Sequence, residues 1–333
     1  MSCLVAIVGP TGIGKSQLAL RLARVFDGDI IGADSRQVYR YMDIGTAKPK
    51  REDVSLIPHH LINIMNPDEG FSLGQYQELA YNAIADVQLR NKLALLVGGS
   101  GQYVWSVLEG WGIPRVVPDL EFRHSLEERA AKGDKDELYR ELVAVDPAAV
   151  YVIDRRNVRR VIRALEVYRG TGIPFSQLQH KQAPPFSTLI IGLTAERTAL
   201  YRRTDSRVDE MVKQGLVDEV EMLANMGYNF NLPAMSGISY KQIGMFLRKE
   251  LSLTVAIQQI KFETHRFVRH QYSWFPLKDD RIQWFDIKNE IESEIIGLVA
   301  GFLKTEKQID NEINSLSGSQ SSFGKGSDIK EAG

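Results

Sequence analysis

The strongest constraint on this chain is a glycine-rich segment that follows a short apolar run near the N-terminus. Residues 3–8 are all apolar, a pattern typical of a strand buried on both faces of a parallel sheet. Residues 9–16 then read G-x-x-x-x-G-K-S, and apolar side chains recur at helical spacing after them. A strand, a glycine loop and a helix in this order predict a phosphate-binding loop in an α/β fold. The alternative, a glycine-rich turn without a ligand, is disfavoured by this context.

Each part of this loop suits an anion. The glycines allow backbone N–H groups to converge on phosphate oxygens, and the helix that follows adds the partial positive charge of its N-terminus. The lysine supplies a point charge, and the serine hydroxyl is placed to ligate Mg²⁺. We therefore predict that the ligand's phosphates are held by Gly9, Pro10, Thr11, Gly12, Ile13, Gly14, Lys15 and Ser16, with Ser16 as the metal ligand.

Composition limits the classes of protein to which this chain can belong. The 333 residues suffice for one large or two moderate domains, and a net charge of −1 excludes a global basic field, so nucleic acid must bind a local patch. Cys3 is the only cysteine, which excludes an intrachain disulfide and a cysteine-rich zinc site. The first strand starts almost at the N-terminus and is too short to span a bilayer, so we expect a cytoplasmic protein without a membrane partner.

The apolar patterns predict three regions. Further strands are expected at 29–33, 61–65, 93–97, 188–193 and 281–287. Two long amphipathic helices are expected over 208–223 and 257–271. Residues 113–187 are charged and helical, bounded by prolines, and read as an insertion between two strands. We therefore predict a catalytic core formed by residues 1–112 and 188–304, a helical insertion at 113–187, and a disordered polar tail at 305–333.

Two polar residues follow predicted strands at the sheet edge that carries the phosphate loop. Asp34 comes directly after strand 29–33, where a carboxylate faces the ligand crevice of an open α/β sheet. We interpret it as a general base, with a turn or cap aspartate as the alternative. Ser100 follows strand 93–97 and either hydrogen-bonds the same acceptor or serves as a turn residue. That strand ends in Gly-Gly-Ser instead of an aspartate, so nucleotide hydrolysis is not favoured.

Arginines gather in two places. Arg155, Arg156, Arg159, Arg160 and Arg163 lie on adjacent strips of one predicted helix in the insertion. Such a strip suits the backbone of a nucleic acid, with a solvated helix face paired to nearby carboxylates as the alternative. Three more arginines, at positions 202, 203 and 207, open the helix after the insertion, where a guanidinium could clamp a diphosphate.

Five segments of the chain resemble the tRNA dimethylallyltransferases of bacterial type, the family that prenylates an adenine next to the anticodon. They are GPTGIGKS at 9–16, ADSRQVYRYMDIGTAKP at 33–49, LLVGGSGQY at 95–103, RRVIRALEVYRGTG at 159–172 and LYRRTDSRVDEMVKQGLVDEV at 200–220. The resemblance covers residues 4 to about 285, and the MDIGTAKP and RALEVY stretches in this order are highly specific. It implies a P-loop NTPase-like core of three layers that carries a helical insertion.

The resemblance also implies roles. The loop would bind the diphosphate of dimethylallyl diphosphate with Mg²⁺, and the acceptor would be a flipped adenine of the tRNA anticodon stem-loop. Asp34 matches the general base on the adenine amine, Ser100 supplies a hydroxyl to the same site, and Arg203 matches the arginine at the diphosphate. The positions that match tRNA-contact segments are Asp34, Ser35, Arg36, Gln37, Ser100, Arg123, Arg159, Arg160, Val161, Ile162 and Arg163. A monomer is the default expectation.

Departures from the family pattern are few. Threonine is common at the position of Ser100, and serine keeps the hydroxyl. His265 and His270 stand where arginines are usual, which places some RNA contacts in doubt and predicts mild pH dependence. Two other functions remain open from the residues alone: a small-molecule kinase that uses ATP, and a P-loop RNA-binding module without catalysis.

Overall fold

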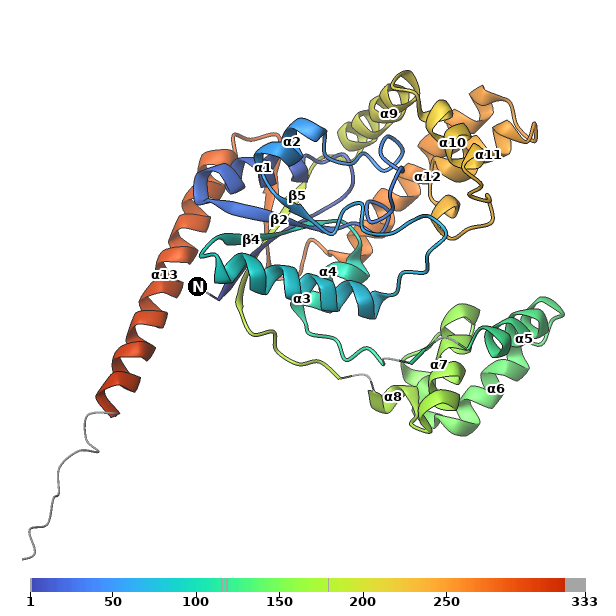
Figure 1. The fold of residues 1–333 in the computed structure, drawn as a ribbon, viewed down its shortest axis with the longest axis horizontal. Coiled ribbons are helices and arrows are strands. Elements are labelled where there is room, and N and C mark those ends of the chain that lie inside the picture. The colour runs from blue at the N-terminus through green and yellow to red at the C-terminus, as the bar shows by residue number, and fades with distance from the viewer. Residues whose placement is uncertain (1, 115, 118, 179, 321–333) are drawn as a thin grey trace, which may run out of the picture. The chain divides into compact units, whose positions relative to one another are not determined.

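The computed structural model describes residues 2–114, 116–117, 119–178 and 180–320, which form two compact units. The first unit comprises the chain up to Phe71, Glu78–Val104 and the chain from Pro185 onward, and the second comprises Ser72–Gln77 and Trp105–Pro184. Figure 1 shows both units and labels their α-helices and some of their strands. The second unit has its own buried cluster, and it begins before the insertion predicted at 113–187.

The first unit is built on a fully parallel sheet with the strand order β3-β2-β4-β1-β5-β6. Its strands are β1 (Cys3–Val8), β2 (Gly28–Ala33), β3 (His59–His60), β4 (Leu93–Gly98), β5 (Ser187–Thr194) and β6 (Ile282–Asp286). This sheet confirms the predicted α/β class. Because β1, β2 and β4 are adjacent and parallel, the segments that follow them meet at one edge of the sheet.

Helices surround this sheet and complete the first unit. They are α1 (Lys15–Phe26), α2 (Arg51–Leu56), α3 (Leu73–Leu89), α4 (Gly101–Leu108), α9 (Arg197–Lys213), α10 (Leu216–Asn225), α11 (Tyr240–Leu247), α12 (Leu253–Trp274) and α13 (Glu292–Gln320), with a short 3-10 turn at Ala234–Ser236; the first turn of α3 and the end of α4 belong to the second unit. None of the described helices is long and apolar enough to cross a membrane.

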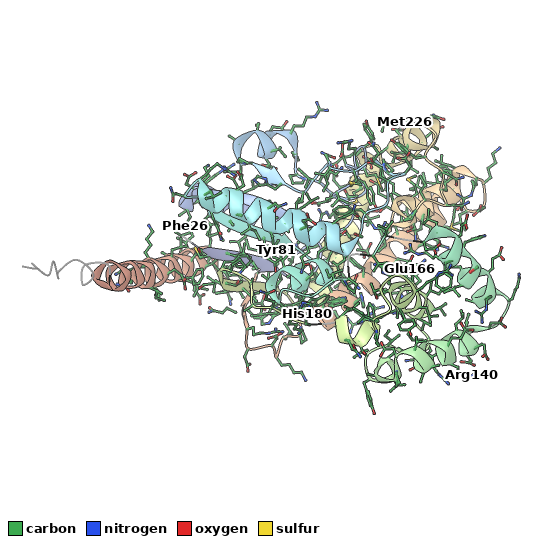
Figure 2. The ribbon with its side chains drawn as sticks, turned by 60° about the horizontal axis from the view of Figure 1, so that its bottom comes forward. Phe26, Tyr81, Arg140, Glu166, His180 and Met226 are labelled. Atoms are coloured by element: carbon green, nitrogen blue, oxygen red, sulfur yellow. The ribbon has the colours of Figure 1, made fainter. Side chains whose placement is uncertain are left out.

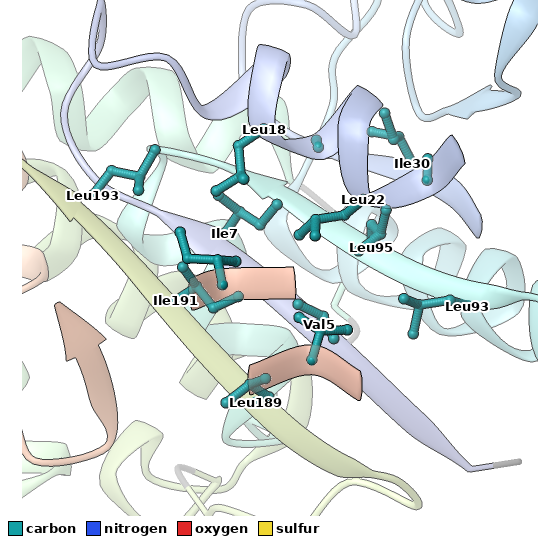
Figure 3. Close-up of a cluster of buried hydrophobic side chains, with 14 of the residues drawn as sticks. Val5, Ile7, Leu18, Leu22, Ile30, Leu93, Leu95, Leu189, Ile191 and Leu193 are labelled. Atoms are coloured by element: carbon teal, nitrogen blue, oxygen red, sulfur yellow. The ribbon is translucent and has the colours of Figure 1, made fainter. Parts of the chain in front are cut away.

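One face of the sheet packs against α1 and α13. Alternate residues of β1, such as Val5 and Ile7, contribute to a buried cluster with Leu18 and Leu22 of α1 and with Val299 of α13. Figure 3 shows the α1 leucines lying over side chains from β1, β4 and β5. The other residues of β1 are equally buried, as the uninterrupted apolar run predicts for a strand covered on both faces. The phosphate loop thus follows an interior strand of the sheet that is buried along its whole length.

The second unit is a small helical bundle. It contains α5 (Leu120–Ala131), α6 (Lys135–Val145), a 3-10 turn (Pro147–Tyr151), α7 (Val158–Thr171) and α8 (Phe175–Leu178). Asp119 caps α5 by accepting the N–H of Phe122 at 3.0 Å, and Asn157 caps α7 by accepting the N–H of Arg160 at 3.2 Å. Both caps are residue types that are favoured at helix N-termini because a side-chain oxygen accepts a backbone N–H of the first turn.

Two predicted elements are wrong in position or length. The strand expected at 61–65 is a two-residue strand at His59–His60, because Leu61 and Asn63 have φ values of 64° and 55°. A left-handed backbone at alternate residues cannot continue a ladder. The helix expected over 208–223 is divided into α9 and α10 by Gly215, whose φ of 100° ends the helical path.

The prediction of a disordered tail at 305–333 is wrong in part. The helix α13 continues through residues 305–320, which the polar composition predicts to be disordered. Phe302 and Leu303 pack against the core cluster and fix the preceding turns, and the next residues include the good helix formers Lys304, Glu306 and Lys307. The remainder of the predicted tail, residues 321–333, lies outside the described residues.

Candidate active site

The carboxyl edge of the sheet carries a cavity of about 740 Å³ in the first unit. It is lined by the phosphate loop, by the segments that follow β2 and β4, by α9 and by α12. The lining residues are Thr11, Gly12, Gly14, Lys15, Ser16, Gln17, Asp34, Gln37, Thr46, Ala47, Val97, Gly98, Gly99, Arg202, Arg203, Ser206, Arg207, Glu210 and Gln271. Cationic side chains therefore share one space with two carboxylates, that of Asp34 after β2 and that of Glu210 on α9.

The phosphate loop has the backbone that its glycines predict. Gly9 and Gly14 have φ values of 135° and 109°, which strain any residue with a side chain. A Cβ atom at Gly9 would also lie 2.5 Å from the carbonyl oxygen of Leu193 in β5. The Lys15 ammonium donates to the carbonyl oxygens of Gly9 at 2.9 Å and Pro10 at 2.8 Å. The loop thus holds its own lysine at the cavity.

Lys15 is electrostatically poised for an anion. Burial lowers its pKa to about 7, a shift that Asp34 opposes and that Arg207 reinforces. The Lys15 amine is therefore close to half-protonated at neutral pH as long as no anion is bound. A diphosphate placed beside it would raise the pKa again, so binding favours the protonated lysine.

Asp34 lies in the turn directly after β2 and lines the cavity. Its Oδ1 atom accepts the backbone N–H of Arg36 at 2.8 Å, while Oδ2 receives no hydrogen bond from the residues that the structure describes. One oxygen therefore fixes the turn and the other can accept a proton. The turn role and the base role, which the sequence leaves as alternatives, are compatible.

Ser100 joins the two turns that flank the carboxylate. Its Oγ atom accepts the backbone N–H of Ser35 at 3.1 Å and lies 3.4 Å from the Ser35 hydroxyl. The glycines beside it are tightly enclosed, since a Cβ atom at Gly98 would lie 2.0 Å from the carbonyl oxygen of Ala33. Ser100 therefore holds the turn that carries Asp34 against the end of β4.

The arginines of α9 differ in their surroundings. Arg203 is exposed at the cavity, as a residue that meets an incoming diphosphate would be. Arg207 is half-buried one turn later, and burial lowers its pKa against the opposing effect of Asp34. The sequence suggests Arg207 only as one of three clamp candidates, whereas the structure places it beside Lys15 and Asp34.

Gln271 is a site residue that sequence reasoning misses. Its Oε1 atom accepts the backbone N–H of Thr11 at 2.8 Å, and its Nε2 atom donates to the carbonyl oxygen of Gly99 at 3.1 Å. The side chain is 3% exposed and thus connects the phosphate loop to the segment that carries Ser100. The only signal in the sequence is a polar residue on the apolar stripe of the helix over 257–271.

The predicted RNA contacts of the insertion divide into two groups. Arg123 and Arg163 bind the buried carboxylate of Glu166, at 2.7 Å and 2.5 Å, and Figure 2 labels Glu166 on α7. Burial alone would raise the pKa of Glu166, but the hydrogen bonds and charges of the two arginines together outweigh burial and hold the pKa below its ordinary value. Both guanidiniums thus have a structural partner.

The second group comprises the exposed arginines of α7. Arg159 and Arg160 are exposed and form no ion pair with any residue that the structure describes. Val161 and Ile162, which follow them, are 1% and 3% exposed and belong to the core of the second unit, so any part that they play in RNA binding is indirect. Arg159 and Arg160 are the arginines of this helix best placed for phosphate groups.

Several other predicted residues have structural partners in the first unit. The Arg36 guanidinium donates to the carbonyl oxygen of Pro233 at 2.7 Å, and Gln37 donates to those of Thr46 and Ala47. His265 stacks on Tyr201 with 4.0 Å between ring centroids and contacts Asp205 at 2.8 Å. His270 accepts the indole N–H of Trp274 at 3.1 Å.

The residues present fit a magnesium ion that arrives with its ligand. The Ser16 hydroxyl is exposed at the first turn of α1 and lines the same cavity as the Asp34 carboxylate. Among the described residues no group of three His, Cys, Asp or Glu side chains could hold a metal alone. Mg²⁺ is commonly held by one or two protein oxygens together with water and substrate phosphates, which is the donor set available here.

Known proteins are similar in sequence to this chain over most of its length. The tRNA dimethylallyltransferase of Dehalococcoides mccartyi strain 195 is 50% identical over 300 residues, which cover 90% of this chain and 92% of that protein. The enzyme of the same name from Roseiflexus castenholzii is 50% identical over 272 residues, covering 82% and 89%.

Solved structures agree with these relatives. The full-length tRNA isopentenylpyrophosphate transferase of Bacillus halodurans superimposes with a TM-score of 0.70 at 36% identity, over 93% of this chain and all of that one. A eukaryotic dimethylallyltransferase solved acting on tRNA superimposes with a TM-score of 0.78 at 26% identity, over 92% of this chain and 80% of that one. The profile of the IPP transferase family matches residues 37–279. The chain therefore belongs to the IPP transferase family, and it is a prenyltransferase of the tRNA dimethylallyltransferase type.

Proposed function

We propose that this chain transfers the dimethylallyl group of dimethylallyl diphosphate to the exocyclic amine of the adenine 3′-adjacent to the anticodon in tRNA. The observation that carries the proposal is one cavity that joins the phosphate loop and the α9 arginines to the carboxylate of Asp34. The C–O bond of the allylic donor breaks, diphosphate leaves, and a new C–N bond forms to the adenine. The amine proton goes to the carboxylate.

The donor end of the cavity suits an allylic diphosphate. Such a donor ionises readily once the charge that develops on its leaving group is stabilised. The cations that line this space are Lys15, Arg202, Arg203 and Arg207, and the N–H groups of the glycine loop add fixed dipoles. Mg²⁺ bound at Ser16 with the diphosphate oxygens would supply further positive charge to the leaving group.

The acceptor end suits a weakly basic amine. The free Oδ2 atom of Asp34 can accept its proton, and Ser100 holds the turn that orients this carboxylate. An adenine stacked in an anticodon loop must leave the stack to reach the cavity, at a cost of a few kcal/mol. Contacts between Arg159, Arg160 and RNA phosphates would offset this cost.

Donor choice tests the proposal against its alternatives. The protein is incubated with Mg²⁺, tRNA and either labelled dimethylallyl diphosphate or ATP labelled at its terminal phosphate. We expect label to pass from the prenyl donor to tRNA and none to pass from ATP to any acceptor. Phosphate transfer from ATP to a metabolite without RNA would instead support the kinase, which the comparisons do not favour. Retention of tRNA without turnover of either donor would support a binding module.

A further inference from the structure

A buried carboxylate outside the cavity holds the loop that follows Gln37. Glu219 of α10 is 8% exposed, and its two carboxylate oxygens accept the backbone N–H groups of Asp43, Ile44 and Gly45 at 2.9, 2.7 and 3.0 Å. The hydroxyl of Tyr240 in α11 donates to the same carboxylate at 2.7 Å. Four donors thus converge on one side chain, which we call the Glu219 clamp.

Tyr240 completes the clamp by packing as well as by its hydrogen bond. Its ring is 1% exposed and lies against Gly45, where a Cβ atom would approach ring atoms to 2.6 Å. Burial, together with the neighbouring carboxylate, raises the pKa of Tyr240 well above its ordinary value, so the phenol keeps the proton that it donates. Only a residue without a side chain fits between this ring and the carboxylate.

The clamped loop is a wall of the candidate active site. Thr46 and Ala47, which follow Gly45 directly, line the 740 Å³ cavity together with residues of α9. Ala47 also lines a second cavity of about 810 Å³, which shares Arg207 with the first. Gln37 donates to the carbonyl oxygens of Thr46 and Ala47 from the Asp34 side. The loop is therefore fixed at one end by the site and at the other by the clamp.

We infer that Glu219 and Tyr240 are positioning residues for donor binding, which set the spacing between the wall at 46–47 and the arginines of α9. Neither side chain lines the cavity, so both act through the loop. Glu219 lies on α10, which Gly215 joins directly to the helix of Arg203 and Arg207. The clamp therefore connects the two walls between which the diphosphate binds. This inference rests on the proposed function.

The test compares Glu219→Gln, Tyr240→Phe and the control Glu221→Gln, which changes an exposed residue of the same helix. Glutamine turns an NH₂ group toward backbone N–H donors, whereas phenylalanine removes one of four hydrogen bonds and keeps the ring on Gly45. We measure the Kd of inorganic diphosphate with Mg²⁺ by calorimetry, and the KM and kcat for dimethylallyl diphosphate. Hydrogen exchange of amides 43–45 reports whether the loop is released.

We expect Glu219→Gln to raise Kd and KM about tenfold and Tyr240→Phe to raise them about threefold. A small displacement of a binding wall weakens ligand binding strongly. The control should match the wild type. A purely structural role would lower the melting temperature and the active fraction, and hence kcat, while Kd and KM stay unchanged; that result would overturn the inference. If Glu219→Gln does not fold, Tyr240→Phe carries the same test. Wild-type protein that binds diphosphate without prenyl transfer would refute the proposed function but leave the Kd comparison valid.

Discussion

The protonation of Lys15 depends on whether the cavity holds an anion, because burial lowers its pKa to about 7. Its ammonium contacts two loop carbonyl oxygens in the structure, and its pKa of about 7 reflects burial. A bound diphosphate replaces solvent with negative charge at this position. Diphosphate binding therefore favours protonation of Lys15, and protonation of Lys15 favours diphosphate binding.

The linkage predicts how diphosphate affinity changes with pH. Above about pH 7 the free protein carries a neutral Lys15 and must take up a proton to bind the anion, so affinity should fall by up to about tenfold per pH unit. Calorimetry at pH 8 in buffers of different ionisation enthalpy should detect uptake of close to one proton. Lys15→Met controls for the titration of diphosphate itself. Equal uptake by both proteins would contradict the linkage.

Asp34 has one carboxylate oxygen in the turn and one available for a proton. Asp34→Asn keeps an oxygen that can accept the Arg36 N–H but removes the base. We expect kcat to fall by about 10² to 10⁴ with the melting temperature nearly unchanged. Single-turnover transfer to tRNA measures this loss. Near-normal transfer by the variant would show that another group takes the amine proton.

Gln271 satisfies one backbone group on each of two loops. Gln271→Leu leaves the Thr11 N–H and the Gly99 carbonyl oxygen without this partner, at a cost of about 1–3 kcal/mol in the free energy of unfolding. Gln258→Leu, an exposed position on the same helix, is the control. Urea denaturation compares the two variants. Equal stability would mean that water replaces the lost hydrogen bonds.

The helix α7 separates arginines that stabilise the insertion from arginines that remain available. Arg163 binds Glu166, whereas Arg159 and Arg160 are exposed. Arg159 and Arg160 lie in the first turn of α7, which begins directly after its cap at Asn157. The element thus combines a buried ion-pair network with an accessible cationic strip.

This separation predicts different effects on RNA binding. Arg159→Ala with Arg160→Ala should weaken tRNA binding and lower the slope of log K against log salt by about one per lost phosphate contact. Donor affinity and melting temperature should stay unchanged. Arg140→Ala, an exposed arginine of α6, is the matched control. An unchanged salt dependence would show that Arg159 and Arg160 do not contact RNA phosphates.

At the element scale, apolar periodicity predicts the long features and misses the local ones. The strands β1, β2, β4, β5 and β6 are expected within one or two residues of their observed bounds. The strand prediction fails at β3 because Leu61 and Asn63 have a left-handed backbone. Neither residue is a glycine, so the sequence does not indicate this conformation. Gly215 is visible in the sequence, but a glycine inside a helical pattern does not by itself indicate a break.

On the scale of the whole molecule, the donor chemistry lies in one unit and a separate basic strip lies in the other. The cavity is lined entirely by the first unit, while Arg159 and Arg160 belong to the second. The positions of residues next to strand ends, such as Asp34 and Ser100, can be predicted because topology brings those ends together, whereas their roles in the reaction stay predictions. Gln271, Glu219 and Arg207 could not be assigned this way, since their roles depend on contacts with segments far away in the sequence.

The central claim is that this one cavity joins a prenyl diphosphate to an RNA base. The most direct measurement incubates the protein with Mg²⁺, dimethylallyl diphosphate and unmodified tRNA, followed by nuclease digestion and mass spectrometry. We predict one dimethylallyl group on the adenosine 3′-adjacent to the anticodon, with one diphosphate released per modified tRNA. Unmodified tRNA, or a prenyl group on any other nucleoside, would contradict the account.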